Sequence, residues 1–379
     1  MKKERPVTWH RFLFLAFAGV SVITGLLAAL ALLGYLGGTR AAGLATDHGP
    51  LMIFGFVGGA IGLERTVAVR TWWSWLGPVC SAAGVSTLLA GLPVAVPALL
   101  FTGSFLLLGL VYATVHRRQA TAAVIAQAAG VTGAVCATLV WGFADSGGFA
   151  AAMPPAVVFV VATIIGERLE LARIPVTAGD PESLITGLVL ALAAAGILGV
   201  VAPDAGYVVM GLLLSTIAVV TARVDVARRL IRSRGLPRFS AVCMMLGYGW
   251  LALAGLIWVA FGRTSTGFLY DAAVHAVFLG FVISMIFAHA PIILTAVIRL
   301  PLPYHPVMYV PVALLHGGLA LRLLGDARQV TQLWQFGGII NVTAVLAFLL
   351  TAVTLSMSAG HRRRTTRQER TARRDAGTV

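Results

Sequence analysis

Five of the eight histidines lie within or beside long apolar runs, where an ionisable side chain is costly in a lipid environment. These are His48, His275, His289, His305 and His316. A neutral imidazole is a good ligand for iron and copper, and it also carries protons near neutral pH. We therefore treat these five side chains as the first candidates for metal, haem or proton chemistry. The others, His10, His116 and His361, lie in or beside basic clusters, and we expect no specific role for them.

The elements that position these histidines are predicted to be membrane-spanning helices. The chain has 379 residues, of which 59% are hydrophobic and 11% are charged, and its mean hydropathy is +0.91. A helix needs roughly 20 apolar residues to cross a bilayer. Twelve suitable runs lie at residues 12–37, 48–69, 73–92, 94–115, 120–143, 149–167, 183–202, 205–223, 240–262, 268–297, 305–324 and 331–357. We therefore predict an all-α polytopic membrane protein in which residues 1–358 form a single domain of 12 transmembrane helices.

Lysine and arginine are unevenly distributed between alternate loops. One side carries both termini, the tail from His361, and Lys2, Lys3, Arg5, Arg70, Arg117, Arg118, Arg168, Arg173, Arg228, Arg229, Arg232, Arg234 and Arg299. The other side carries Arg40, Arg263, Arg322 and Arg328. Because basic loops stay in the cytoplasm, we expect cytoplasmic termini in a bacterial-type inner (plasma) membrane. We expect residues 359–379 to form a disordered basic tail near anionic lipid, so the net charge of +14 indicates the lipid bilayer rather than nucleic acid as partner.

This topology assigns a depth to each histidine. His48 opens the second span on the outer side, His275 lies about two turns into the tenth span from the same side, and His316 lies in the outer half of the eleventh. His289 follows His275 by 14 residues, so it lies roughly 21 Å closer to the cytoplasm and only about 40° around the helix. His305, in "PLPYHPV", is interpreted as a loop residue at the inner boundary.

Three of the predicted spans have similar sequences. They contain "GFVGGAIGLE" (55–64), "VFVVATIIGE" (158–167) and "GFVISMIFAH" (280–289), which share Phe-Val and Ile and end at Glu64, Glu167 and His289. Chance matching between apolar helices is one explanation. The other is a bundle of three four-helix arcs with pseudo-threefold symmetry. Glu64 and Glu167 are each followed by arginine, which favours paired charges at the helix ends, although Glu64, Glu167 and His289 also outline an alternative polar pathway.

His48, His275 and His316 converge on the outer leaflet, which favours a metal or haem site over proton transport. A haem with two axial histidines needs one from each of two facing helices, with small residues that leave room for the porphyrin. Glycines lie beside these histidines, although glycine serves close helix packing in membranes equally well. We therefore regard His48, His275, His316 and His289 as candidate metal ligands.

The segment "HGPLMIFGF" resembles the second span of subunit I of the haem-copper oxidases, where a histidine binds the low-spin haem. A closer resemblance is to the NnrS family of twelve-span haem- and copper-binding proteins linked to nitric oxide metabolism. Members of that family carry an HxHEMLFGF-type motif early and an HAxxxG motif late. The matching residues are His48, Met52, Phe54, Gly55 and Phe56 in the first motif, and His275, Ala276 and Gly280 in the second.

This resemblance implies a haem b between His48 and His275. Arg263 and Arg322 lie on the same outer side, so we expect them to pair with the haem propionates. The resemblance also implies a haem-dependent role in nitric oxide metabolism, in the nitrosative stress response, or in membrane electron transfer with a redox partner. If the protein is an enzyme, the resemblance implies a haem-dependent oxidoreductase.

Departures from both families affect the copper site. Pro50 replaces the second histidine of the early motif, and the sixth span reads "AAMPPAVVF" without histidine. The usual copper ligands are absent, so copper would need another set such as His275 with His316, and we do not expect an oxygen-reducing centre. The alternative class is a transporter for a metal or small anion without haem.

Overall fold

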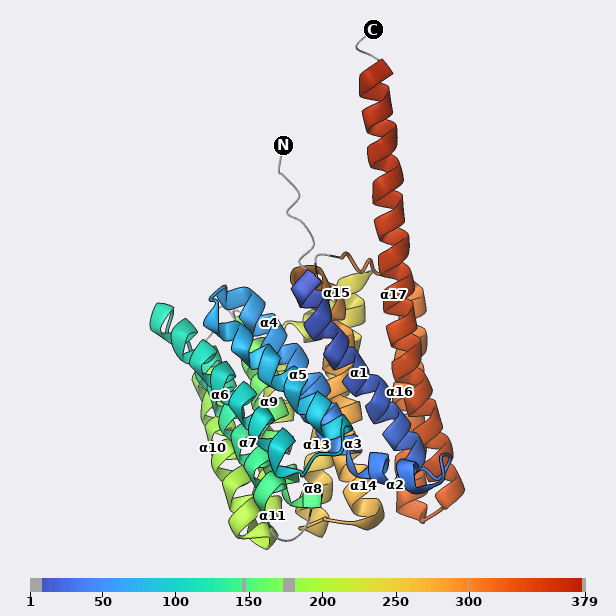
Figure 1. Cartoon of the computed structure of the whole chain (residues 1–379). Coiled ribbons are helices and arrows are strands. Elements are labelled where there is room, and N and C mark those ends of the chain that lie inside the picture. The colour runs from blue at the N-terminus through green and yellow to red at the C-terminus, as the bar shows by residue number, and fades with distance from the viewer. Residues whose placement is uncertain (1–8, 145–147, 173–180, 299, 377–379) are drawn as a thin grey trace.

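The structure is a computed structural model that describes residues 9–144, 148–172, 181–298 and 300–376. Every regular element in these ranges is a helix, and none of the described residues forms a β-strand. Figure 1 shows the long helices packed side by side as one bundle. The predicted all-α class is therefore confirmed for the described part of the chain.

Ten helices in the described ranges are long and apolar enough to cross a membrane, and each overlaps one predicted run. The first five are α1 (Trp9–Leu32), the continuous helix formed by α3 (His48–Pro50), η1 (Leu51–Gly58) and α4 (Gly59–Val69), α6 (Ala95–Arg118), α7 (Ala122–Phe143) and α10 (Pro181–Val201). The others are α11 (Pro203–Val224), α13 (Leu236–Phe261), the continuous helix of α14 (Gly267–His275), η3 (Ala276–Ile283) and α15 (Ser284–Ile298), η4 (Pro306–Met308) with α16 (Tyr309–Arg328), and α17 (Thr331–Ala376).

Two further helices overlap the remaining predicted runs. Helix α5 (Leu76–Leu89) has 14 residues, which corresponds to a length of about 21 Å. Helix α9 (Met153–Ala172) is longer, but Glu167, Arg168 and Glu170 make its second half polar. Shorter helices in the connections are α2 (Thr39–Thr46), η2 (Trp73–Trp75), α8 (Gly148–Ala151) and α12 (Ala227–Leu230).

Helix α9 lies inside the bundle, and its residues 156–162 are at most 1% exposed. Its side chains there are apolar on all sides, which suits the interior of a helix bundle, and α7 and α10 pack against it. Gly133 of α7 allows this close packing, because a Cβ atom there would lie 2.7 Å from the carbonyl oxygen of Pro155.

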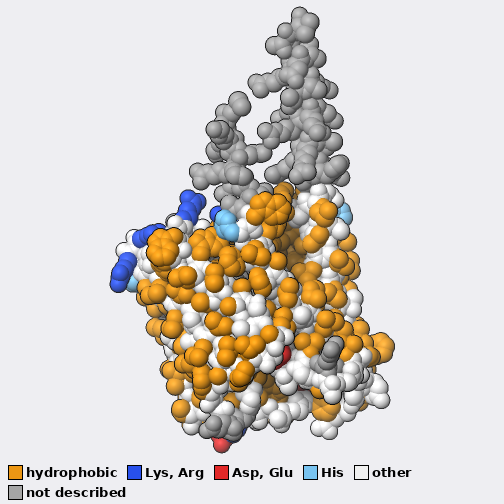
Figure 2. Space-filling model, viewed as in Figure 1, with side chains coloured by type: hydrophobic (Ala, Val, Ile, Leu, Met, Phe, Trp, Pro, Cys, Tyr) orange, Lys and Arg blue, Asp and Glu red, His pale blue; other side chains and the backbone are white. Residues whose placement is uncertain are grey.

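The outer wall of the bundle is apolar. Leu99, Leu106 and Leu110 on α6 are each more than half exposed, and Figure 2 shows hydrophobic side chains covering most of the visible wall. A continuous apolar surface of this size is unfavourable in water and favourable against lipid chains. The fold is therefore that of a multi-pass helical membrane protein.

Helix α1 begins and α17 ends at the same end of the bundle (Figure 1), in agreement with the prediction that both termini lie on one side. Helix α17 continues to Ala376, whereas the sequence predicted disorder from residue 359. The segment is rich in Arg, Gln, Glu and Ala, which all have high helix propensity, and it continues a helix that has already formed.

Candidate functional site

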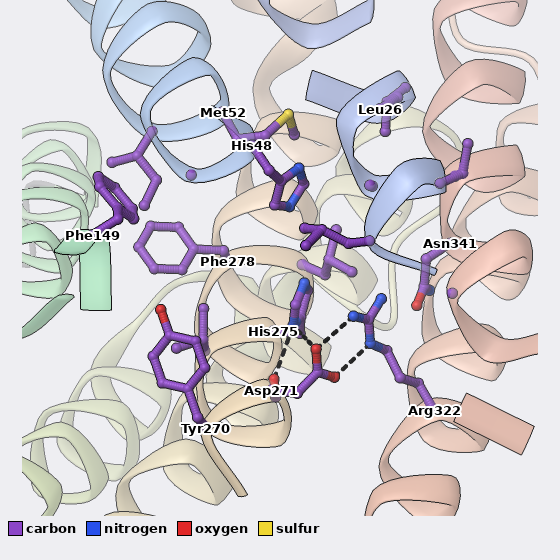
Figure 3. Close-up of a pocket in the computed structure, with 18 of the residues that line it drawn as sticks. Leu26, His48, Met52, Phe149, Tyr270, Asp271, His275, Phe278, Arg322 and Asn341 are labelled. Carbon is purple, nitrogen blue, oxygen red and sulfur yellow. Dashed lines mark hydrogen bonds and ion pairs between the residues drawn. The ribbon is translucent and has the colours of Figure 1, made fainter. Parts of the chain in front are cut away.

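His48 and His275 face each other in the described structure. Their ring centroids are 6.4 Å apart and the ring planes differ by 23°. Figure 3 shows the two imidazoles entering one cavity, His48 from the helix that contains η1 and His275 from the end of α14. Of the candidate ligands, the structure brings this pair together.

The Nδ1 atom of His48 lies 2.8 Å from the backbone carbonyl oxygen of Gly25 on α1. A carbonyl oxygen only accepts hydrogen bonds, so Nδ1 must carry the proton and donate it. The Nε2 atom therefore keeps its lone pair, and among the described residues it has no hydrogen-bond partner. This tautomer is the one required of a metal ligand that binds through Nε2.

The Nδ1 atom of His275 is held in the same way, by Asp271 one turn earlier on α14. It lies 2.9 Å from the backbone carbonyl oxygen of Asp271 and 3.2 Å from a carboxylate oxygen of the same residue. Both atoms are acceptors, so Nδ1 donates, and in the neutral imidazole the lone pair is on Nε2. In their neutral forms the two imidazoles thus have the same tautomer.

Asp271 is itself fixed by Arg322 and Trp334. The Nε and Nη2 atoms of Arg322 donate to the two carboxylate oxygens over 2.7 and 2.6 Å, and Nε1 of Trp334 donates over 3.0 Å. A paired guanidinium keeps this partly buried carboxylate ionised and oriented. The side chain behind His275 is therefore a charged acceptor in a fixed position.

Both histidines lie shortly before π-helical segments. After His48, Gly49 and Pro50, the helix widens over η1, and after His275 it widens over η3. Each segment has eight residues. Such insertions are rare and frequently occur at functional sites. In the two helices that carry His48 and His275, the departure from regular α-helix thus lies close to each histidine.

The cavity between the histidines has a volume of about 480 Å³, within the usual range of small-molecule and cofactor sites. Its walls are mostly apolar and include Leu26, Ala29, Met52, Phe149, Phe278 and Gly338. Figure 3 shows Phe149, Phe278 and Tyr270 on one side of the histidine pair, and Leu26, Asn341 and Arg322 on the other. The space therefore extends to both sides of the axis that joins the two rings.

The two arginines predicted to pair with the haem propionates lie in different places. Arg322 lines the cavity, but its guanidinium is bound to Asp271, so its observed role is to hold the acceptor of His275. Arg263 is exposed in the connection between α13 and α14 and does not line the cavity. The structure therefore does not bring Arg263 to the cavity.

His316, another predicted ligand, is separate from the pair of His48 and His275. Nε1 of Trp250 donates to Nδ1 of His316 over 2.8 Å, so the proton of this imidazole is on Nε2, which faces Ser284 at 3.5 Å. Its side chain does not line the cavity. The proposed copper set of His275 with His316 is therefore not assembled.

His289 is also engaged elsewhere. Nη1 of Arg168 donates to Nε2 of His289 over 3.1 Å, which occupies the lone pair that a metal would need. Arg168 also binds both carboxylate oxygens of Asp225, and Tyr248 donates to one of them. Burial raises the pKa of Asp225, but the hydrogen bonds and charge of Arg168 outweigh it, so the pKa lies below its ordinary value. The structure therefore places His289 in this network with Arg168.

Glu167 lies in a neighbouring polar cluster. Nη2 of Arg65 is 3.1 Å from Glu167, and Nη1 is 3.0 Å from Glu170. Glu64 is close to the same charges. The sequence predicted paired charges at these helix ends. In the structure the ion pairs connect α4 with α9, instead of joining each glutamate to the arginine that follows it.

Other candidates lie outside these sites. His305 caps η4, since its Nδ1 accepts the backbone N–H of Val307 over 3.2 Å, in agreement with its interpretation as a loop residue. Among the described residues, no group of three or more His, Cys, Asp and Glu side chains is arranged to hold a metal ion.

Sequence reasoning missed Asp271, Gly25, Trp334 and Phe149. The sequence does indicate a contact between Asp271 and His275, because Asp271 lies four residues earlier in "DAAVH", one helical turn away. Nothing in the sequence indicates the contacts of the other three residues, since these contacts depend on how distant helices pack.

The fold and this site define an all-helical, multi-pass membrane protein with a paired-histidine cavity. Residues 11–357 match a family described as "Domain of unknown function (DUF8744)", and the chain belongs to that family. A comparison with curated proteins gives no match.

Proposed function

We propose that this protein is an integral membrane haem protein in which His48 and His275 are the axial ligands of one haem b. The observation that carries the proposal is the pair of facing imidazoles whose Nδ1 atoms are both held by acceptors, so that Nε2 is the free nitrogen of each ring. Iron–nitrogen bonds of about 2 Å, with about 1.1 Å from nitrogen to ring centre on each side, would separate two axial ring centroids by roughly 6.2 Å. The observed separation is 6.4 Å, and the apolar cavity extends sideways from it.

A bound haem would supply one-electron redox chemistry. The residues of the chain would fix both axial positions: Gly25 and Asp271 hold the imidazoles by Nδ1, and the apolar walls exclude water. Because His48 and His275 would both hold the iron, we favour a role in membrane electron transfer over direct reaction of a substrate at the haem. The resemblance to NnrS supports nitric oxide metabolism, or the response to nitrosative stress, as the process served.

We further propose that α5 and α9 also cross the membrane, which gives twelve spans in the arrangement of haem-copper oxidase subunit I. Two observations support this proposal: each of these helices packs between neighbouring spans, and each overlaps a predicted apolar run. The lysine and arginine asymmetry supports a bacterial inner membrane location with both termini cytoplasmic. On this orientation the histidine pair lies toward the outer face.

The experiment is an absorption spectrum of the protein purified from cells supplied with a haem precursor. We expect a Soret band, a pyridine haemochrome of b type, and loss of the low-spin spectrum in His48→Ala and His275→Ala. His305→Ala and His316→Ala are matched controls that keep the spectrum. A purified, folded protein without a Soret band would contradict the proposal and favour the metal or anion transporter.

A further inference from the structure

A second cavity lies at the opposite end of the bundle from the connection that carries Arg263. It has a volume of about 310 Å³ and is lined by Arg234, Gly235, Arg238, Val242, Tyr304 and Tyr309. These residues come from the start of α13 and from the segment that leads into α16. Figure 1 places both segments at the end where α1 begins and α17 leaves the bundle. We call these six residues the basic pocket.

The basic pocket has a strong excess of positive charge. Residues 228–238 contain five arginines, and neither 226–270 nor 299–325 contains an aspartate or glutamate. In the described part of the chain, neither Arg234 nor Arg238 makes an ion pair. The two guanidinium groups are therefore available to an external anion, and planar guanidinium groups match phosphate oxygens well.

Two tyrosines complete the pocket, and their rings are fixed by one buried side chain. Phe239 packs against Tyr304 and Tyr309 with ring centroids 6.3 and 5.3 Å apart. The Tyr309 hydroxyl lies near Tyr304 and Arg238. Neither hydroxyl is hydrogen-bonded to a described residue, so both are available as donors. Two cations and two neutral donors thus surround one small space.

Apolar surface continues from the pocket toward the middle of the bundle. Leu246 lies one turn beyond Val242 on α13, and Val310 follows Tyr309 on α16. Both side chains are exposed, at 41% and 54%. A free phosphate ion would gain nothing from this surface, whereas a lipid could lay its acyl chains against it.

We propose that the basic pocket binds the phosphate group of an anionic phospholipid, with the acyl chains along α13 and α16. Basic pockets between membrane helices bind lipid headgroups of this kind. The tyrosine rings are suited to the interface between headgroups and chains. This inference does not depend on haem, because none of the pocket residues contacts the histidine cavity.

The test is native mass spectrometry of the detergent-purified full chain titrated with phosphatidylglycerol, phosphatidylcholine or inorganic phosphate. We expect phosphatidylglycerol to bind at least about tenfold more tightly than phosphatidylcholine, because both lipids offer the same phosphate but the positive choline group of phosphatidylcholine is repelled by the two guanidinium groups. The double substitution Arg234→Gln with Arg238→Gln should lower the affinity for phosphatidylglycerol at least about tenfold. Arg228→Gln with Arg232→Gln is the matched control, because it removes the same charge from exposed arginines outside the pocket and should have little effect.

Tyr304→Phe with Tyr309→Phe separates a specific pocket from a generally basic surface, because it removes two hydroxyls without changing the charge. We expect a several-fold loss of phosphatidylglycerol binding. The proposal is overturned if the control pair weakens binding as much as the pocket pair, or if the tyrosine variant binds like the wild type. Displacement of the lipid by equimolar inorganic phosphate would assign the pocket to a free anion and overturn the lipid proposal.

Discussion

The two imidazoles at the centre of the proposed site are held by acceptors of different strength. His48 donates to a neutral backbone carbonyl, whereas His275 also faces a carboxylate that Arg322 keeps in place. A charged acceptor gives an imidazole partial imidazolate character and makes it a stronger electron donor to a metal. Asp271 is therefore expected to stabilise the oxidised state of a haem bound by His275.

The first prediction concerns Asp271→Asn. Loss of the carboxylate should raise the reduction potential of the haem and lower haem affinity by about 10- to 100-fold, the usual cost of losing such an outer partner. Potentiometric titration and haem retention measure these effects. Trp334→Phe is a milder control, because it removes one hydrogen bond to Asp271 and keeps the charge. An unchanged potential in Asp271→Asn would show that the carboxylate serves only packing.

At the scale of elements, the two π-helical segments distinguish the histidine-bearing helices. Helix α9, whose sequence resembles theirs, carries no such segment and no histidine. It instead provides Glu167 and Arg168 to two polar clusters that join it to α4 and to the connection after α11. The second prediction follows from the more buried of these clusters.

Arg168 and Asp225 form a buried ion pair, with Asp225 4% exposed. Asp225→Asn leaves the guanidinium without its counter-charge and should lower the free energy of unfolding by about 3–5 kcal/mol near neutral pH. Because the pKa of Asp225 is lowered in the folded state, its contribution is present above the unfolded-state pKa of about 4 and is lost as the pH falls further. Thermal unfolding of both proteins from pH 7 downward measures this. A difference that disappears well above pH 4 would contradict the assignment.

Sequence reasoning located the main elements because apolar runs of span length have few alternative structures. It also selected His48 and His275, since their depths and helices agreed with a known motif. It did not separate His316 and His289 from that pair, because depth along a helix does not fix the direction of a side chain. Trp250 and Arg168, which bind those two imidazoles, lie 66 and 121 residues away in sequence. Such contacts arise only from the packing of distant helices.

At the scale of the whole molecule, the arginine-rich connections and the common end of both termini define one face of the bundle. The third prediction is that this face is cytoplasmic. Phosphatase and fluorescent-protein reporters fused after Val379 should show that the C-terminus is inside, and a reporter placed in the connection before α2 should show that it is outside. A C-terminal fusion active only in the periplasm would reverse the orientation and put the histidine cavity near the inner face.

The most direct measurement of the central claim is the electron paramagnetic resonance spectrum of the purified ferric protein. Two neutral imidazoles whose planes differ by 23° should give a low-spin, rhombic spectrum, because nearly parallel ligand planes separate the iron d orbitals strongly. His48→Ala and His275→Ala should each abolish this signal, whereas His316→Ala should keep it. A low-spin rhombic signal that requires both histidines is the result we predict. A high-spin signal in the wild type, or a low-spin signal that survives loss of either histidine, would contradict the account.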